Sequence, residues 1–299
     1  MLKHKKLINK ILKSFSVMFL LLNILAFIHA YKFTHFSDSG SEKTQKPNQL
    51  SLGEKIKIAI FGVKNPRPQN KMTPEKKYKT IILDAGGNIE GWLFKTQKVI
   101  ISKGTVIICH GYGGEKSSML DKATVFDSLG YNTILIDFMG SGGSQGNTTT
   151  IGYKEAQQVK AAFEYIVSEG EKNIVLYGTS MGAAAILKAV NDYQIKVKAI
   201  IAECPFGSLY QTVKARFTTM NAPAFPMAQL MVFWGGIQNG YWGFSHSPVE
   251  YAKGINVPTL LMVGEDDKYV SIDETKAIFN NLKGFKTLEI FKNTGHENY

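Results

Sequence analysis

A serine between two glycines stands where an apolar run meets a helical pattern. The run NIVLYG (173–178) leads into Gly178-Thr179-Ser180-Met181-Gly182, and MGAAAILKAV (181–190) continues with helical character. A strand that turns sharply into a helix is the backbone context of a nucleophile elbow, which strains the serine and exposes its Oγ. The helix N-terminus adds partial positive charge, which favours a developing anion. The pattern predicts a nucleophilic Ser180; the alternative is a serine in an ordinary glycine-rich turn.

A serine hydroxyl needs a base, and the chain has six histidines. His296 follows a glycine in FKNTGHENY, just after the last strand-like run. A histidine on a loop at the carboxyl edge of the final strand could reach Ser180. The competing interpretation is a solvated residue of the C-terminal tail. His110 precedes a glycine at another strand end, where we expect it to hold the loop rather than act as a base.

The base in turn needs a carboxylate to orient it. Asp266 and Asp267 follow the apolar run LLMVG and precede a helix whose start carries a capping box, Ser271 with Glu274. Carboxylates in such turns are usually surface or capping residues. Here, serine, acid and histidine occur in the chain order of one known triad arrangement, and each follows a predicted strand. Agreement of order and strand edge favours a triad.

Short apolar runs alternate with helical patterns from Tyr78 onward. Such alternation indicates a mostly parallel sheet with helices on both faces. A hairpin is expected near Gly86-Gly87. The expected strands are 104–111, 132–138, 173–178, 197–204, 258–264 and 286–291, the expected helices are about 115–129, 153–168, 181–193 and 272–282, and a further strand is possible at 55–62.

Over about residues 78–299 the sequence resembles the α/β-hydrolase superfamily, in particular the serine aminopeptidase-like and prolyl-oligopeptidase-like branch of membrane-anchored bacterial hydrolases. The matching motifs are HGYGG (110–114), GTSMG (178–182), GEDD (264–267), Gly295-His296 and, with about one extra residue, DFMGSGGSQG (137–146). The resemblance implies an eight-stranded α/β-hydrolase fold with a small helical cap insert.

The same resemblance implies roles for individual residues. The acid three residues after Gly264 is Asp267 rather than Asp266, and Glu203 is a fallback because some members use that strand. The backbone N–H groups of Tyr112 and Met181 would form the oxyanion hole; the alternative is a glycine-rich loop without catalytic donors. No metal or organic cofactor is implied. A nucleophilic serine argues against dehalogenase and epoxide hydrolase chemistry, which use aspartate in this fold.

The chain contains two cysteines, Cys109 and Cys204, too few for a disulfide scaffold and without metal-ligand spacing. In the strand order of the resembled family, both lie near carboxyl ends of strands with the strand of Ser180 between them. Two strand spacings, about 9.6 Å, exceed the reach of a disulfide. We therefore predict two buried thiols that are not joined.

The positive charge is confined to the N-terminal part. Residues 1–80 carry 16 Lys/Arg against 4 Asp/Glu, whereas residues 81–299 carry 19 against 20. A neutral globular part without a basic stripe argues against nucleic-acid binding. A lysine-rich start followed by the uncharged run 15–30 indicates a signal anchor or signal peptide. Ile28 weakens a cleavage site after Ala30, which favours the anchor. Both alternatives place the rest of the chain outside the cytoplasm, either membrane-anchored and facing the periplasm or cell exterior, or secreted.

The expected organisation is a leader at 1–31, a linker with N-terminal decoration at 32–77, and a hydrolase domain at 78–299 with a cap at about 205–250. No carboxylate lies between Phe206 and Pro248, which disfavours recognition of a substrate amino group by the cap. The first hypothesis is a serine hydrolase of carboxylic esters or thioesters. The alternatives are a peptidase or amidase of the same fold, and a membrane-tethered, non-catalytic binding protein.

Overall fold

The protein is described by a computed structural model that places residues 2–37, 40, 42, 44 and 51–296. Eight strands form one sheet in the order β1-β2-β4-β3-β5-β6-β7-β8. The β1–β2 and β2–β4 pairs are antiparallel and the remaining pairs are parallel. The strands are β1 (Lys79–Asp84), β2 (Asn88–Phe94), β3 (Thr105–Cys109), β4 (Asn132–Ile136), β5 (Ile174–Thr179), β6 (Ala199–Glu203), β7 (Thr259–Gly264) and β8 (Lys286–Phe291).

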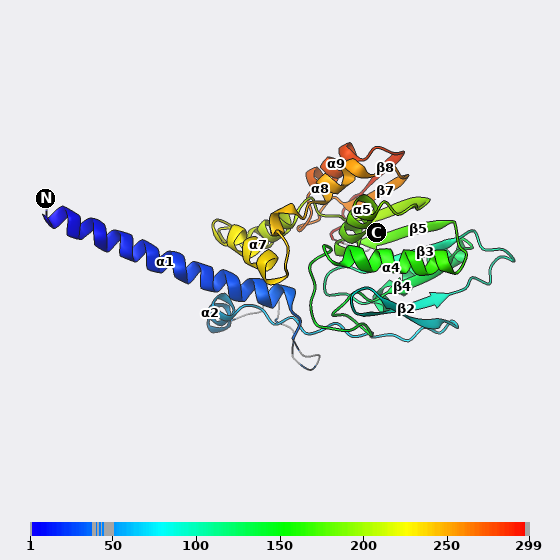
Figure 1. Cartoon of the computed structure of the whole chain (residues 1–299), viewed down its shortest axis with the longest axis horizontal. Helices are drawn as coiled ribbons and strands as arrows, with labels where there is room; N and C mark the ends of the chain where they lie inside the picture. The colour runs from blue at the N-terminus through cyan, green and yellow to red at the C-terminus, as the bar shows by residue number, and fades with distance from the viewer. Residues whose placement is uncertain (1, 38–39, 41, 43, 45–50, 297–299) are drawn as a thin grey trace.

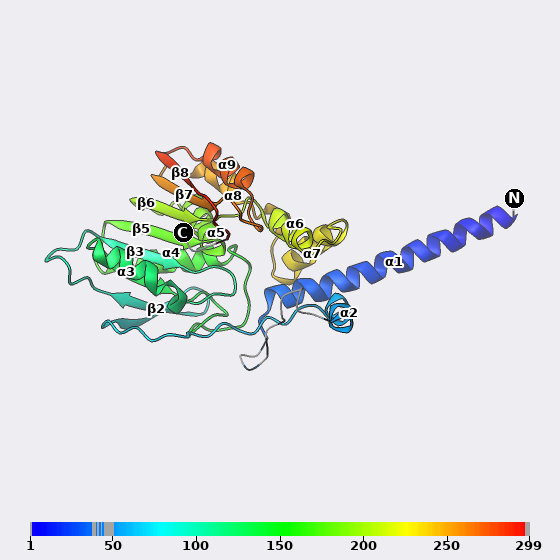
Figure 2. The ribbon, with the colours of Figure 1, turned by 180° about the vertical axis from the view of Figure 1, so that it is seen from behind.

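Helices cover both faces of the sheet (Figures 1 and 2), so the central strands are buried on both sides. Helices α4 and α5 lie over one face and α3 over the other. The helices of the sheet layers are η2 (Lys116–Met119), α3 (Leu120–Ser128), α4 (Glu155–Ser168), α5 (Met181–Tyr193), α8 (Pro248–Tyr251), η4 (Ala252–Gly254) and α9 (Ile272–Asn281). This architecture confirms the predicted α/β-hydrolase fold class.

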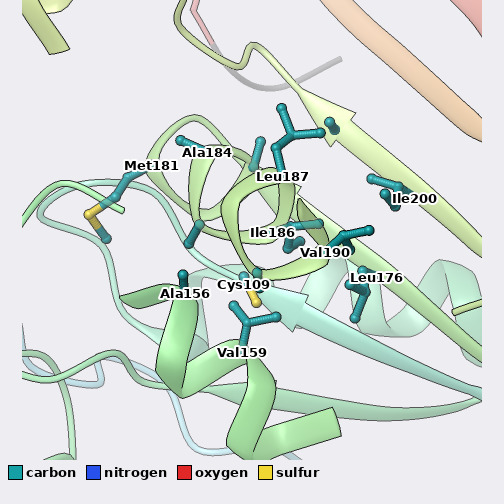
Figure 3. Packing of buried hydrophobic residues seen from close by; sticks show 14 of the residues in the cluster. Cys109, Ala156, Val159, Leu176, Met181, Ala184, Ile186, Leu187, Val190 and Ile200 are labelled. Atoms are coloured by element: carbon teal, nitrogen blue, oxygen red, sulfur yellow. The ribbon is translucent and has the colours of Figure 1, made fainter. Parts of the chain in front are cut away.

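The packing of α5 explains how firmly the serine turn is held. Every residue from Met181 to Val190 is buried. Figure 3 shows Ala184, Ile186 and Leu187 on this helix, with Val159 of α4 and Cys109 of β3 beside it. The three consecutive alanines at 183–185 have no exposed surface, and their small side chains permit a close approach. The helix that begins directly after Ser180 is therefore a fixed part of the core.

The segment between β6 and β7 forms the helical cap. It contains α6 (Leu209–Thr219), α7 (Met227–Gln238) and η3 (Gly243–Ser245). Helix α7 packs against the first helix of the chain, α1 (Leu2–Thr34), as both ribbon views show. Trp234 Nε1 donates to Asn23 Oδ1 at 3.1 Å, and its ring meets Phe27 edge-on with centroids 5.4 Å apart.

Helix α1 is long and apolar enough to cross a membrane over His4–Thr34. Thirty-one residues at 1.5 Å each span about 46 Å, whereas a hydrocarbon core is about 30 Å thick. By length and composition, the helix could therefore cross a bilayer. Most of its large apolar side chains before Asn23 are exposed.

The possible strand at 55–62 was wrong, because these residues belong to helix α2 (Leu52–Phe61). Ser51 and Glu54 form a capping box that starts the helix, with Ser51 N donating to Glu54 Oε2 at 2.8 Å. The alternation of lysine and isoleucine suggested a strand. Ile56 is exposed, however, so its side chain does not pack against a sheet that would stabilise an extended conformation.

The residues that follow α1 are bound to the hydrolase domain. Phe36 is buried, and its N–H donates to Asn147 O at 2.7 Å. Thr34 O accepts from Thr149 N at 2.9 Å. Further along, Lys71 N donates to Ser117 Oγ at 3.0 Å. Parts of the predicted linker at 32–77 therefore lie directly beside the loops that follow β3 and β4.

Candidate active site

Ser180 occupies a strained turn between β5 and α5. Its backbone has φ 53° and ψ −108°, outside the regions that residues with a Cβ favour. Ser180 N donates to Glu203 O at 2.8 Å, which fixes the turn to β6. The flanking glycines are required by space: a Cβ at Gly182 would lie 2.4 Å from Cys109 O, and one at Gly178 would lie 2.6 Å from Gly182 C. The local sequence thus builds the elbow, and Ser180 remains partly exposed.

His296 and Asp267 lie in a hydrogen-bonded line with this serine. Ser180 Oγ is 3.1 Å from His296 Nε2, and His296 Nδ1 is 2.6 Å from Asp267 Oδ2. An ionised carboxylate only accepts, so Nδ1 carries the proton and Nε2 is the acceptor for the serine hydroxyl. The sheet order explains why the three residues lie together. Ser180, Asp267 and His296 follow β5, β7 and β8, and the loops after these parallel strands share one edge of the sheet.

Of the three candidate acids, Asp267 is the one whose carboxylate contacts His296. Its side chain has no exposed surface, and Oδ1 accepts from Tyr269 N at 2.8 Å and Val270 N at 3.0 Å. Asp266 is exposed. The carboxylate of Glu203 faces elsewhere, with Oε2 accepting from Tyr177 O–H at 2.8 Å and Thr179 O–H at 2.5 Å.

The backbone amides of Met181 and Tyr112 are the predicted oxyanion donors. Met181 is the first residue of α5, where an N–H has no partner within the helix. Tyr112 lies in the turn after β3. Neither amide donates to another group in the described part of the chain. They remain available to a ligand oxygen.

The side chain of Tyr112 joins this loop to the N-terminal segment. Its O–H donates to Phe33 O at 2.8 Å and accepts from Asn65 Nδ2 at 3.1 Å. The Tyr112 and Phe33 rings stack with centroids 4.9 Å apart. Burial raises the pKa of the Tyr112 hydroxyl, so it stays protonated and keeps donating. The sequence did not predict this contact, which spans 79 positions.

A buried ion pair between Lys116 and Asp137 lies beside the loop that follows β3. Lys116 Nζ contacts Asp137 Oδ2 and lies 2.7 Å from Glu90 Oε1, and Lys116 N donates to Asp137 Oδ1 at 2.6 Å. His110 is fully buried; its Nε2 accepts from Phe138 N at 3.0 Å, and its Nδ1 donates to Gly111 O at 2.8 Å. Burial lowers the pKa of His110, although Asp137 opposes the shift. His110 therefore holds the loop.

Cys204 lies next to the histidine, which the sequence analysis missed. Its Sγ is 4.0 Å from His296 Nε2, and its backbone has φ 42°. A residue directly after β6 must lie between the loops that carry Ser180 and Asp267, so the strand order could have revealed it. Cys204, Asp267 and His296 place potential metal-ligand atoms within 4.8 Å of one another. His296 and Asp267 are already joined by a hydrogen bond. Both cysteines are buried thiols outside any disulfide, which confirms that prediction.

Two more side chains border the site without having been predicted. The Tyr269 ring meets the His296 imidazole edge-on with centroids 5.4 Å apart. The guanidinium of Arg216, on cap helix α6, lies over Tyr269 with Cζ 4.2 Å from the ring centre. Cation and ring come from the cap and from the loop after β7. No sequence pattern links them.

Comparisons with known proteins agree with the fold. The family described as "Serine aminopeptidase, S33" matches residues 101–240, and the family "PhoPQ-activated pathogenicity-related protein" matches residues 245–299. The solved structure of the Pyrococcus furiosus esterase Pf2001 superposes with a TM-score of 0.62 at 23% identity, covering 77% of this chain and 88% of that one. A likeness of this degree shows the fold.

Two curated proteins are similar in sequence. The YqkD protein of Bacillus subtilis is 28% identical over 196 residues, which are 64% of this chain and 64% of that protein. The lysophosphatidylserine lipase ABHD12 of Rattus norvegicus is 23% identical over 193 residues, which are 62% of this chain and 47% of the lipase. The chain thus spans just under two thirds of the first relative and about half of the second.

Proposed function

We propose that this chain, which has the α/β-hydrolase fold, is a serine hydrolase that cleaves carboxylic esters or thioesters through an acyl-enzyme on Ser180. The observation that carries the proposal is the line from Ser180 Oγ through the His296 imidazole to the buried Asp267 carboxylate, with links of 3.1 and 2.6 Å. These are the contacts by which a base activates a hydroxyl. The names of the similar esterase and lipase agree with it.

The reaction proceeds in two acyl transfers. His296 Nε2 takes the hydroxyl proton as Ser180 Oγ bonds to the carbonyl carbon, and Asp267 stabilises the resulting imidazolium. The tetrahedral intermediate collapses, the bond to the leaving alcohol or thiol breaks, and His296 gives it the proton. Water then loses a proton to His296 and attacks the acyl-enzyme. The collapse of the second intermediate returns the proton to Ser180 and releases the carboxylic acid.

The amides of Tyr112 and Met181 would stabilise the negative oxygen in both intermediates. Preorganised backbone donors gain strength as charge develops, and loss of one such donor costs roughly 3–4 kcal/mol in comparable sites. The availability of both N–H groups supports this role. The strained backbone of Ser180 exposes its side chain, and the partial positive charge at the N-terminus of α5 favours an anion at the same place.

Ester cleavage is preferred to peptide cleavage because of the cap. Between Phe206 and Pro248 no aspartate or glutamate occurs that could bind a peptide's free amino group. The family description that matches residues 101–240 keeps an aminopeptidase as the second candidate.

We propose that α1 anchors the enzyme in the membrane with the hydrolase domain outside the cytoplasm. Its lysine-rich start would remain inside. The uncleaved form is favoured because Ala30, the residue before the possible cleavage site, lies within α1 and is only 2% exposed. Intact mass of the protein extracted from membranes distinguishes the anchor from a cleaved signal peptide.

The direct test compares the wild type with Ser180→Ala on p-nitrophenyl esters of increasing acyl length and on aminoacyl p-nitroanilides. Ester turnover that disappears in Ser180→Ala supports the proposal, and turnover of anilides alone supports the peptidase. A fluorophosphonate probe should label wild-type Ser180. Absence of both turnover and labelling would refute a serine hydrolase and leave a binding protein.

A further inference from the structure

We propose that Arg216 binds an anionic group on the leaving alcohol of the ester, so that the preferred substrates are acyl esters of phosphate-bearing alcohols. This inference rests on the proposed hydrolase function and specifies its substrate class. Arg216 lies on α6 of the cap, outside the residues that carry out the chemistry.

The first observation concerns the charge of Arg216. No carboxylate pairs with it among the residues that the structure describes. Its Nε is buried and has no hydrogen-bond acceptor in the described part of the chain. Buried donors without acceptors are rare in folded proteins because desolvation without a new bond is unfavourable. A bound anion would supply both the acceptor and the opposite charge.

The second observation is the position of the guanidinium. Its Cζ lies 4.2 Å from the ring centre of Tyr269 and 5.9 Å from that of Phe33. Tyr269 contacts His296, and Phe33 stacks on Tyr112. The Tyr269 ring thus lies between Arg216 and His296. The Phe33 ring lies between Arg216 and Tyr112 of the candidate oxyanion loop. The contact with the Tyr269 ring restricts the guanidinium, and an arginine can offer paired hydrogen bonds to phosphate.

The third step concerns which half of the ester the cation faces. His296 must protonate the leaving alcohol, so that alcohol lies on the His296 side of the scissile bond. Arg216 packs on the ring that touches His296. An anion on that alcohol is therefore expected on the same side of the scissile bond as Arg216. An anion at the far end of the acyl chain would point away from it.

The test uses two water-soluble substrates that differ in one group: monobutyrylglycerol and the same ester with a phosphate on the glycerol. The wild type should show the higher kcat/KM on the phosphate ester. Arg216→Met should lose about 10- to 100-fold of kcat/KM on the phosphate ester, the range of a hydrogen bond to a charged group, and change little on the neutral ester. Arg216→Lys should recover part of the loss, since it keeps the charge without the fork.

Lys214→Met is the matched control, because Lys214 is an exposed cation on the same helix. It should leave the ratio between the two esters unchanged. Equal losses of kcat/KM on both esters in Arg216→Met would show that Arg216 only holds the cap against the N-terminal segment, and this result would overturn the proposal. A wild-type preference for the neutral ester, or for an ester with a carboxylate on its acyl chain, would overturn it as well.

A measurement on the unmodified enzyme covers the case in which Arg216→Met fails to fold. Glycerol 3-phosphate, but not glycerol, should slow fluorophosphonate labelling of wild-type Ser180, and added salt should weaken the protection. Equal protection by both compounds, or by neither, contradicts anion binding. If Ser180 is not labelled at all, the hydrolase function fails rather than the role of Arg216.

Discussion

Replacing Asp267 with asparagine tests the candidate triad most sharply, because it changes one atom of a fully buried side chain. The Asp267 side chain has no exposed surface and accepts three hydrogen bonds, from His296 Nδ1, Tyr269 N and Val270 N. In Asp267→Asn the amide oxygen can keep the two backbone bonds. The amide nitrogen then faces His296 Nδ1 as a donor.

The consequence is a change of tautomer. With a donor opposite Nδ1, the neutral imidazole must place its proton on Nε2, toward Ser180 Oγ at 3.1 Å. Nε2 can then no longer accept the serine proton, and the negative charge that stabilises the imidazolium is gone. The same change in a comparable triad lowers kcat about 10⁴-fold. This corresponds to roughly 5.5 kcal/mol of transition-state free energy.

The assay is kcat on a p-nitrophenyl ester, with thermal unfolding to verify that Asp267→Asn remains folded. Asp266→Asn is the matched control, since Asp266 is the exposed neighbour and should keep its activity. Asp267→Asn retaining more than about a tenth of kcat would refute the assignment. A comparable loss in Asp266→Asn would do so too. Glu203→Gln addresses the fallback acid, and we expect its effect on kcat to be smaller, because Glu203 bonds Tyr177 and Thr179 instead.

Three further predictions concern stability. Tyr112→Phe keeps the ring against Phe33 but removes the O–H at 2.8 Å from its carbonyl, so urea unfolding should show a loss of about 1 kcal/mol; an unchanged midpoint would argue against this link. Gly182→Ala places a Cβ 2.4 Å from a backbone oxygen of β3 and should lower the melting temperature strongly, whereas Gly53→Ala meets nothing within 4 Å and should not. Burial lowers the pKa of His246 to about 4, so as the pH falls the histidine is protonated in the unfolded state before it is protonated in the folded state. The stabilisation is complete above pH 6.5 and falls by up to about 3 kcal/mol as the pH drops toward 4, and denaturant titrations of His246→Gln should show a flatter profile.

The sequence predicted those parts of the site that local structure builds. A strand that runs directly into GTSMG and a helix of small residues is a continuous segment, so its geometry follows from its own residues. The order of Ser180, Asp267 and His296 at strand ends was also informative. In a parallel sheet, the ends of neighbouring strands meet at one edge whatever lies between them in the chain. Helix α2 was missed because alternation over a short stretch also suits a strand.

By itself, then, the sequence determined the fold class, the elbow and the candidate triad, because each depends on contiguous residues or on the direction of parallel strands. Only the tertiary structure decided what surrounds the triad. Phe33 against Tyr112, Arg216 over Tyr269 and Cys204 beside His296 join segments distant in the chain. Such contacts depend on how the cap and the N-terminal segment pack on the sheet, and side-chain packing leaves no periodic trace in the sequence.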